Sequence, residues 1–149
     1  MKNIFDREAS AEILDRLETL QPTLKPLWGK MTVSQMMAHC IVPIKVSLGE
    51  AKVKRTIMGL IFGKMAKKMV VKDEPFKKGL PTDPSFVIKE EPDFNSKKTE
   101  LRSSIEKLLA ADKNAIASIP HPFFGKMTIE EWGILGYKHL DHHLRQFGA

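Results

Sequence analysis

Apolar residues recur at helical spacing along most of the chain, and this pattern predicts an all-helical protein. Asp6 can cap a first helix, which Pro22 would end. The apolar face of this helix carries Ile13, Leu14, Leu17 and Leu20. A second helix is expected from Thr32 to about Leu48, because Thr32-Val-Ser-Gln35 has the sequence of a capping box.

Three further helices follow in the pattern. One is expected from Thr56 to about Met69, where apolar residues alternate with lysines, and the next is capped by Asn95 or Ser96. The last opens at a second capping box, residues 128–131, and runs nearly to the C-terminus. Four or five helices without a strand-rich region predict the all-α class and a compact helix bundle.

A long stretch without helical periodicity, Lys72 to Phe94, follows the helix at 56–69. If that helix is an extra one, this stretch lies in the long connection between helices two and three of a four-helix bundle. It holds four of the nine prolines: Pro75, Pro81, Pro84 and Pro92. Loops of this length are uncommon in compact domains and are often functional. We expect it either to cover one end of a site or to cross the surface.

A short repeat links the second and last helices. Gly29-Lys-Met-Thr32 recurs as Gly125-Lys-Met-Thr128, and each copy leads into a capping box and a histidine-bearing helix. Capping needs alone would also produce such a repeat.

The composition fits one domain, residues 1–149, with 42% hydrophobic and 28% charged residues. No apolar run approaches the roughly 20 residues of a membrane-spanning helix. Met1 to Arg7 lack the apolar run of a secretory signal, and Cys40 is the only cysteine, so no intrachain disulfide can form. Together these features predict a cytoplasmic protein.

The net charge of +6 lies in one region. Between Glu50 and Lys78, nine basic residues stand against three acidic ones. The Lys52–Lys78 segment could bind nucleic acid or an anionic membrane, or it could be a solvated helix face whose apolar side packs on the bundle. We favour the second interpretation, because no nucleic-acid-binding motif is present. We also assign the core-filling role of methionine to Met36, Met37, Met58, Met65 and Met69.

Histidines are the candidate chemistry of this chain. His139 and His143 lie four residues apart, about 40° around a helix, in the middle of the apolar face of the last helix. Two buried imidazoles need polar partners, and a shared divalent metal would satisfy both. His39 is the best third ligand, since residues 33–42 are apolar almost all round. Hydrogen-bonded core histidines without a metal would give the same pattern.

The remaining candidates are weaker. His142 is displaced by about 100° from His143 and is a poorer ligand. Cys40 is displaced by a similar angle from His39, so we expect a buried, inert thiol. His121 lies between two prolines and receives no role. Gly136, beside the paired histidines, leaves room for a neighbouring backbone or a ligand.

Two segments resemble the DinB/YfiT-like superfamily of metal-dependent proteins: Met31-Thr-Val-Ser-Gln-Met-Met-Ala-His39 and Tyr137-Lys-His139-Leu-Asp-His-His143-Leu-Arg-Gln146. Residues 28–32 and 121–128 are similar to the branch catalogued as domain of unknown function 1569. The similarity extends from Ile4 to Gly148 and so covers essentially the whole chain.

The resemblance implies a four-helix bundle with up-down-down-up order, a histidine triad that binds zinc or nickel, and frequent homodimers. Carried over by position, the triad falls on His39, His139 and His143. The superfamily often ends in His-Arg-Gly-Gln, whereas Leu144-Arg145-Gln146 follows His143 here. This departure keeps the ligand but leaves Arg145 without an inferred role.

Three functions fit these observations. The first is a metal-dependent enzyme, a thiol transferase or a hydrolase; the resemblance implies thiol transfer, and the basic segment could attract a small anionic or thiol substrate. A bound metal would lower the pKa of water or a thiol, but no carboxylate is clearly placed as a general base. The second is a non-catalytic protein that binds through Lys52–Lys78. The third is a bundle that keeps the histidines as a closed structural metal site.

Overall fold

The computed structural model describes residues 1–55, 57–80 and 84–149, and within these ranges it is all-helical, as predicted. The described part contains one turn of 3-10 helix, η1 (Pro84–Phe86), and no strand. The six α-helices are α1 (Arg7–Glu18), α2 (Val33–Ser47), α3 (Ile57–Val70), α4 (Phe94–Ala110), α5 (Lys113–Ser118) and α6 (Ile129–Gln146).

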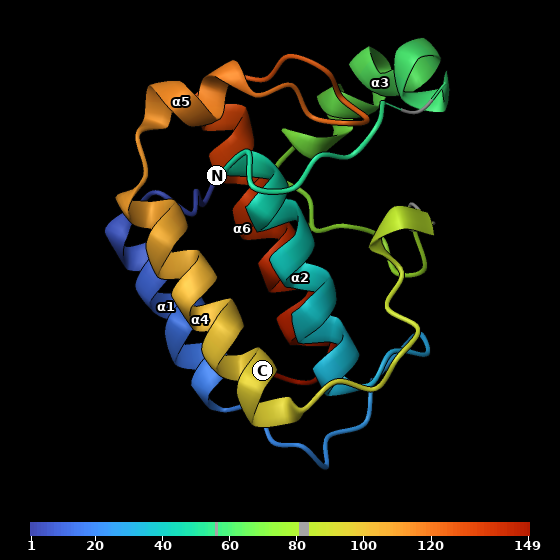
Figure 1. Ribbon diagram of the computed structural model, residues 1–149, viewed down its shortest axis with the longest axis vertical. Helices are drawn as coiled ribbons and strands as arrows, with labels where there is room; N and C mark the ends of the chain where they lie inside the picture. The colour runs from blue at the N-terminus through green and yellow to red at the C-terminus, as the bar shows by residue number, and fades with distance from the viewer. Residues whose placement is uncertain (56, 81–83) are drawn as a thin grey trace.

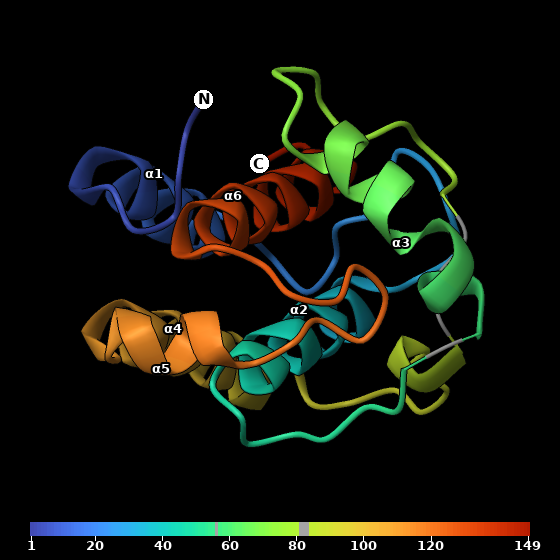
Figure 2. The same ribbon diagram turned by 90° about the horizontal axis from the view of Figure 1, so that it is seen from above.

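Helices α1 and α6 lie side by side, and α2 and α4 form a second pair that faces them (Figures 1 and 2). Two contacts show that α1 and α6 run in the same direction. The Tyr137 hydroxyl donates to the Glu12 carboxylate at 3.1 Å, and Arg16 donates to Asp141 at 2.8 Å. Helix α4 runs parallel to α2, since Lys45 pairs with Glu100 at 2.7 Å while Lys107 pairs with Glu50 further along both.

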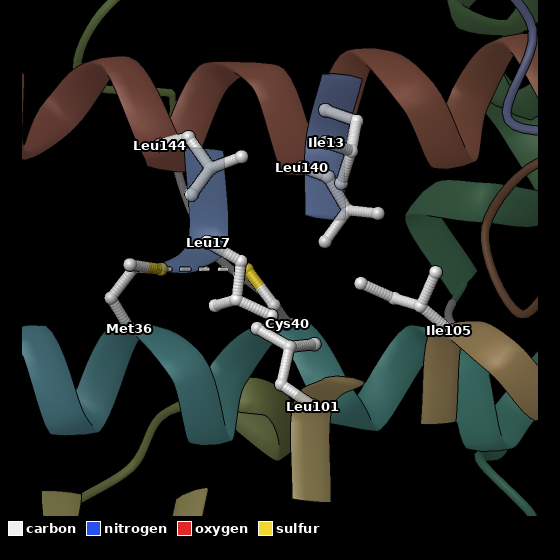
Figure 3. Close-up of a pocket in the computed structure, with 8 residues that line it drawn as sticks. All are labelled: Ile13, Leu17, Met36, Cys40, Leu101, Ile105, Leu140 and Leu144. Carbon is white, nitrogen blue, oxygen red and sulfur yellow. Dashed lines mark hydrogen bonds between the residues drawn. The ribbon is translucent and has the colours of Figure 1, made fainter. Parts of the chain in front are cut away.

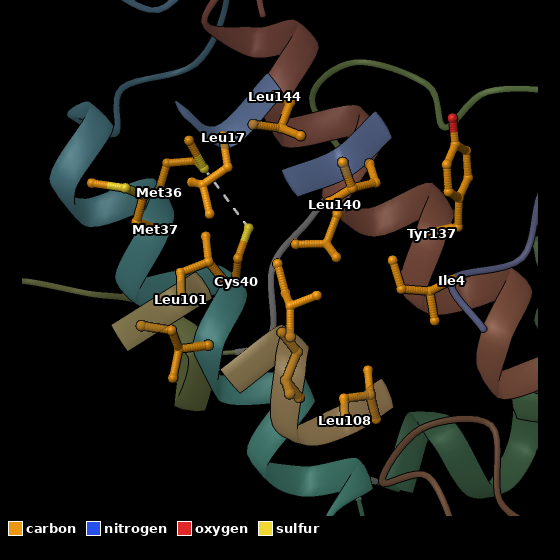
Figure 4. Close-up of a cluster of buried hydrophobic side chains, with 14 of the residues drawn as sticks. Ile4, Leu17, Met36, Met37, Cys40, Leu101, Leu108, Tyr137, Leu140 and Leu144 are labelled. Carbon is orange, nitrogen blue, oxygen red and sulfur yellow. Dashed lines mark hydrogen bonds between the residues drawn. The ribbon is translucent and has the colours of Figure 1, made fainter. Parts of the chain in front are cut away.

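The core fills the space between the two pairs. Its centre is lined by eight side chains from all four helices (Figure 3): Ile13, Leu17, Met36, Cys40, Leu101, Ile105, Leu140 and Leu144. The space left between them is too small for a water molecule. Met37, Leu108 and Tyr137 extend the same cluster (Figure 4). Met36 and Met37 therefore have the core role that the sequence predicts.

Both predicted capping boxes are present. The Thr32 hydroxyl accepts from the backbone amide of Gln35, and the Thr128 hydroxyl accepts from that of Glu131. In return, the Gln35 and Glu131 side chains accept from the backbone amides of Thr32 and Thr128. The repeat is thus a device for entering a helix. Gly29 and Gly125 have φ of +79° and +74°, a left-handed conformation that glycine adopts at little cost, and each turns the chain into its helix.

Three predicted helix starts need correction or qualification. Asp93, not Asn95 or Ser96, caps α4, because its carboxylate accepts from the Ser96 amide at 2.8 Å and so begins the helix earlier. Asp6 occupies the cap position of α1, but its side chain makes no capping bond. Thr56, the expected start of the third helix, lies outside the described residues.

Helix α3 lies outside the two pairs and contradicts a prediction (Figure 2). Its apolar side was expected to pack on the bundle, with Met58, Met65 and Met69 in the core. Instead these methionines are 57–65% exposed, and the buried positions of α3 are Gly59, Gly63 and Val70. The backbones approach too closely for a side chain at one of these positions, because a Cβ at Gly63 would stand 2.2 Å from the Phe123 carbonyl oxygen.

The long stretch before α4 includes η1 and returns along the α2 side of the molecule (Figure 1). Residues 81–83, which include the predicted loop residue Pro81, lie outside the described residues. At its far end this stretch meets α2, where Gln35 donates to the Glu90 carbonyl and Thr32 to the Glu91 carboxylate. No helix in the described ranges has both the length and the apolarity to cross a bilayer.

Candidate metal centre

Helix α2 places His39 against the other pair of helices. The imidazole is 3% exposed, and its Nδ1–H donates to the carbonyl of Phe86 at 3.0 Å. Phe86 belongs to η1, so the long stretch between α3 and α4 contributes a backbone atom beside this histidine. Of the two roles expected for that stretch, covering one end of a site is the one the contact supports. The bond makes Nε2 of neutral His39 the nitrogen that accepts a hydrogen bond or binds a metal.

Helix α6 supplies the other two histidines from one face, as their spacing predicts. His143 is 8% exposed, and its Nδ1–H donates to Oε1 of Gln146 at 2.9 Å. The Gln146 amide is oriented in turn, because its Nε2 donates to the Trp28 carbonyl at 2.7 Å. His139, one turn earlier, is partly buried, and its ring centroid lies 4.7 Å from that of His143.

The three rings converge on one point. His39 Nε2 and His139 Nε2 are 3.1 Å apart, and one nitrogen from each of the three histidines lies within 4.8 Å of the others. Two imidazole nitrogens bound tetrahedrally to zinc at 2.0–2.1 Å would be about 3.3 Å apart. The separation of His39 and His139 is therefore close to the one that a divalent ion requires, and the His143 nitrogen lies within 4.8 Å of both.

Burial keeps these rings neutral. It lowers the pKa of His39, against a smaller opposing effect of the Phe86 carbonyl, and it lowers the pKa of His143 to about 4. The pKa of His139 is lowered well below its usual value by burial first and then by its histidine neighbours. Neutral imidazole is the form that binds a metal, so the rings are ready to do so at neutral pH.

The neighbouring groups remain outside the cluster, as predicted. The His142 ring packs between Trp28, at 5.5 Å between centroids, and Phe76, at 6.2 Å. The Cys40 thiol is buried with its sulfur 3.8 Å from that of Met36, and burial raises its pKa. Among the described residues, the group that could hold a metal consists of His39, His139 and His143 alone.

Two residues have roles that sequence reasoning missed. His121 is 8% exposed, and its Nδ1 accepts from the backbone amides of Phe123 and Phe124 at 3.0 and 3.1 Å, which shapes the loop before α6. In the sequence, the one feature that pointed to a structural role for His121 was its position between Pro120 and Pro122. Gly136 makes room for Ile4, whose Cγ2 would lie 3.3 Å from a Cβ there, and not for a ligand.

The donor set suits a borderline divalent ion. Three neutral imidazoles are typical ligands of zinc, nickel and copper. His39 and His143 each have the hydrogen bond on the second ring nitrogen that metal-bound histidines commonly make. The cluster could therefore hold such an ion at the point where the three nitrogens meet.

The fold and this cluster define an all-helical protein with three converging histidines that could bind a metal. Residues 3–149 match the model of a family described as "Protein of unknown function (DUF1569)", and the chain belongs to that family. Neither the curated proteins nor the solved structures contain a significant match to it.

Proposed function

We propose that this chain is a single-domain, metal-dependent protein that binds one divalent ion through His39, His139 and His143. The observation that carries the proposal is the convergence of three buried or partly buried imidazole nitrogens, two of them 3.1 Å apart. His39 Nε2 and His139 Nε2 are within hydrogen-bonding distance of each other. His143 brings a third nitrogen to the same place, which is one more than that hydrogen bond requires.

The donor count favours chemistry over a closed structural site. Within the described part of the chain, three protein ligands are available and no carboxylate or thiol joins them. Structural zinc sites generally have four protein ligands, whereas catalytic sites have three and an open position. Zinc or nickel is the expected ion.

A bound ion would supply Lewis acidity at the open position, lowering the pKa of a water or a thiol there. The chain's own residues orient the ligands: the Phe86 carbonyl holds the His39 ring, and the Gln146 amide holds His143. We propose a small thiol or anionic molecule as the substrate and group transfer or hydrolysis as the reaction.

We place the fold with the DinB/YfiT-like bundles on the order of its helices. In Figure 1, α1 and α6 descend while α2 and α4 ascend, and these directions support the proposed up-down-down-up order. The two candidate ligand helices, α2 and α6, are adjacent and antiparallel, so that residues near the middle of each can meet. This arrangement supports a shared site. We also propose that the protein is a homodimer and that it is cytoplasmic.

Metal analysis of untagged protein tests the site. We expect about one divalent ion for each chain after zinc loading and desalting, and His139→Ala should lose it. His142→Ala is the matched control: it removes a neighbouring, partly buried imidazole that lies outside the cluster. If His139→Ala retains the ion, or the two variants lose it equally, the proposed site is wrong.

Cobalt substitution tests the substrate class. Co²⁺ in the site should give a visible absorption spectrum, and a low-molecular-weight thiol that binds the open position should change it. Adding an alcohol of the same shape is the control. A spectrum that no thiol or carboxylate alters would contradict the open position, while leaving the metal site itself intact.

A further inference from the structure

Helix α3 presents an unpartnered apolar surface, which we call the outer face of α3. It consists of Ile57, Met58, Ile61, Phe62, Met65 and Met69, which are 41–76% exposed. At 100° for each residue, these six positions span an arc of about 140°, in which Lys68 also lies near one end. Soluble proteins seldom expose contiguous apolar patches of this kind unless the patch binds something.

The contacts of α3 with the bundle hold this face outward. On the inner side, a Cβ at Gly63 would meet the Phe123 carbonyl oxygen, so a large side chain has no room. Polar bonds complete the attachment: the Lys67 ammonium pairs with Glu131 at 2.9 Å, and Lys138 donates to the Val70 carbonyl at 2.8 Å. Turning the apolar arc inward would break these bonds and create the clash.

Unpaired cations border the apolar arc. By helical spacing, Lys64 lies about 20° outside Ile57 and Lys68 about 20° inside it, between Ile57 and Ile61. Both lysines are exposed, and no ion pair joins either of them to an acid among the described residues. Exposed basic residues also flank α3 in the chain: Lys52, Lys54, Arg55, Lys72, Lys77 and Lys78. Helices that lie in the surface of a bilayer likewise combine an exposed apolar face with lysines beside it.

We propose that the outer face of α3 docks on an anionic lipid surface. The six apolar side chains would enter the boundary between headgroups and acyl chains, about 5–10 Å deep. Lys64 and Lys68 would meet the lipid phosphates. A second copy of this chain is a poorer occupant, because it would bring two segments of like positive charge together. Nucleic acid would leave the apolar arc exposed. The inference does not depend on the metal.

Vesicle co-sedimentation of the whole protein tests the proposal. We expect binding to vesicles of phosphatidylcholine mixed with phosphatidylglycerol, weak binding to phosphatidylcholine alone, and loss of binding as salt is added. Ile61→Ser with Met65→Ser should weaken binding by about ten-fold or more, since two apolar anchors are lost. Lys64→Glu with Lys68→Glu should weaken it by about five-fold for each lysine.

Matched controls lie at the loop between α1 and α2. Leu27→Ser removes a side chain that is 70% exposed, and Lys25→Glu reverses an exposed charge. Neither should change vesicle binding, and helical circular dichroism should be unchanged in all variants.

Three results would overturn the proposal. The first is absence of binding to anionic vesicles. The second is binding that the α3 and loop variants alter equally. The third is a protein dimer in solution that the Ile61→Ser and Met65→Ser pair dissociates, because the occupant would then be a second copy. The proposal would also be wrong if the protein bound DNA but not vesicles, and if that salt-dependent binding to DNA were unchanged by Ile61→Ser with Met65→Ser.

Discussion

Replacing Gln146 by leucine removes the two hydrogen bonds that orient His143. Gln146 is 3% exposed; its Oε1 accepts from His143 Nδ1 at 2.9 Å, and its Nε2 donates to the Trp28 carbonyl at 2.7 Å. A buried polar group left without its partner costs roughly 1–3 kcal/mol. We therefore expect the free energy of unfolding of the metal-free protein to fall by about 2–6 kcal/mol, measured by urea denaturation.

The same substitution should weaken metal binding. Without Gln146, nothing holds the proton on His143 Nδ1 or fixes the ring, and loss of such a partner typically costs 10–100-fold in metal affinity. Competition between the protein and a chromophoric zinc chelator measures this dissociation constant directly.

A second variant separates the two bonds. Gln146→Glu keeps an acceptor for His143 but loses the donor to Trp28, so it should lower stability while retaining most of the zinc affinity. Gln21→Leu, at an exposed glutamine after α1, is the control for the change in side-chain type. Unchanged zinc affinity in Gln146→Leu would refute the reasoning that this bond positions a ligand.

Other predictions concern the loop before α6 and the N-terminal segment. His121→Ala should lower the free energy of unfolding by about 2–6 kcal/mol, because the amides of Phe123 and Phe124 lose their acceptor, whereas His121→Asn keeps an acceptor and should cost less; equal losses would contradict this. Burial lowers the pKa of His121 from 6.5 to about 4, so below pH 6.5 the unfolded chain takes up the proton first. The contribution of neutral His121 to the free energy of unfolding is therefore complete above pH 6.5 and falls by about 3 kcal/mol as the pH is lowered to 4. Urea denaturation at several pH values should show a correspondingly smaller loss for His121→Asn. Gly133→Ala should lower the melting temperature, since the added Cβ would stand 1.9 Å from Asn3 Oδ1; a melting temperature equal to that of the unsubstituted protein would show that Asn3 moves at no cost.

The histidine cluster was accessible to sequence reasoning because its signals are local. His139 and His143 are one turn apart, so the helix alone places them together, and the apolar context of residues 33–42 marks His39 as buried. Their meeting across α2 and α6 is a tertiary fact, now seen in the 3.1 Å separation of His39 and His139. The hydrogen bonds to Phe86 and Gln146 were not predicted.

Asp141 shows where the helical pattern misleads. By helical spacing it lies on the side of α6 opposite His139 and His143, yet it is 6% exposed and pairs with Arg16 at 2.8 Å and Arg145 at 3.0 Å. Ile134, which lies on the same side of α6 as Asp141, is also buried. Both follow from the packing of α6 against α1, α2, α3 and α5, which buries more than one of its faces.

Helix positions and ends were largely determined by neighbouring residues, because capping boxes, left-handed glycines and apolar spacing act within a few positions of the chain. The orientation of α3 was not determined in this way. Its apolar pattern is compatible with either a buried or an exposed face, and the outcome depends on the Phe123 backbone and on Glu131, which lie more than fifty residues away in the chain. Which face of a helix is buried depends on the surface that distant segments present to it, and that surface exists only in the folded molecule.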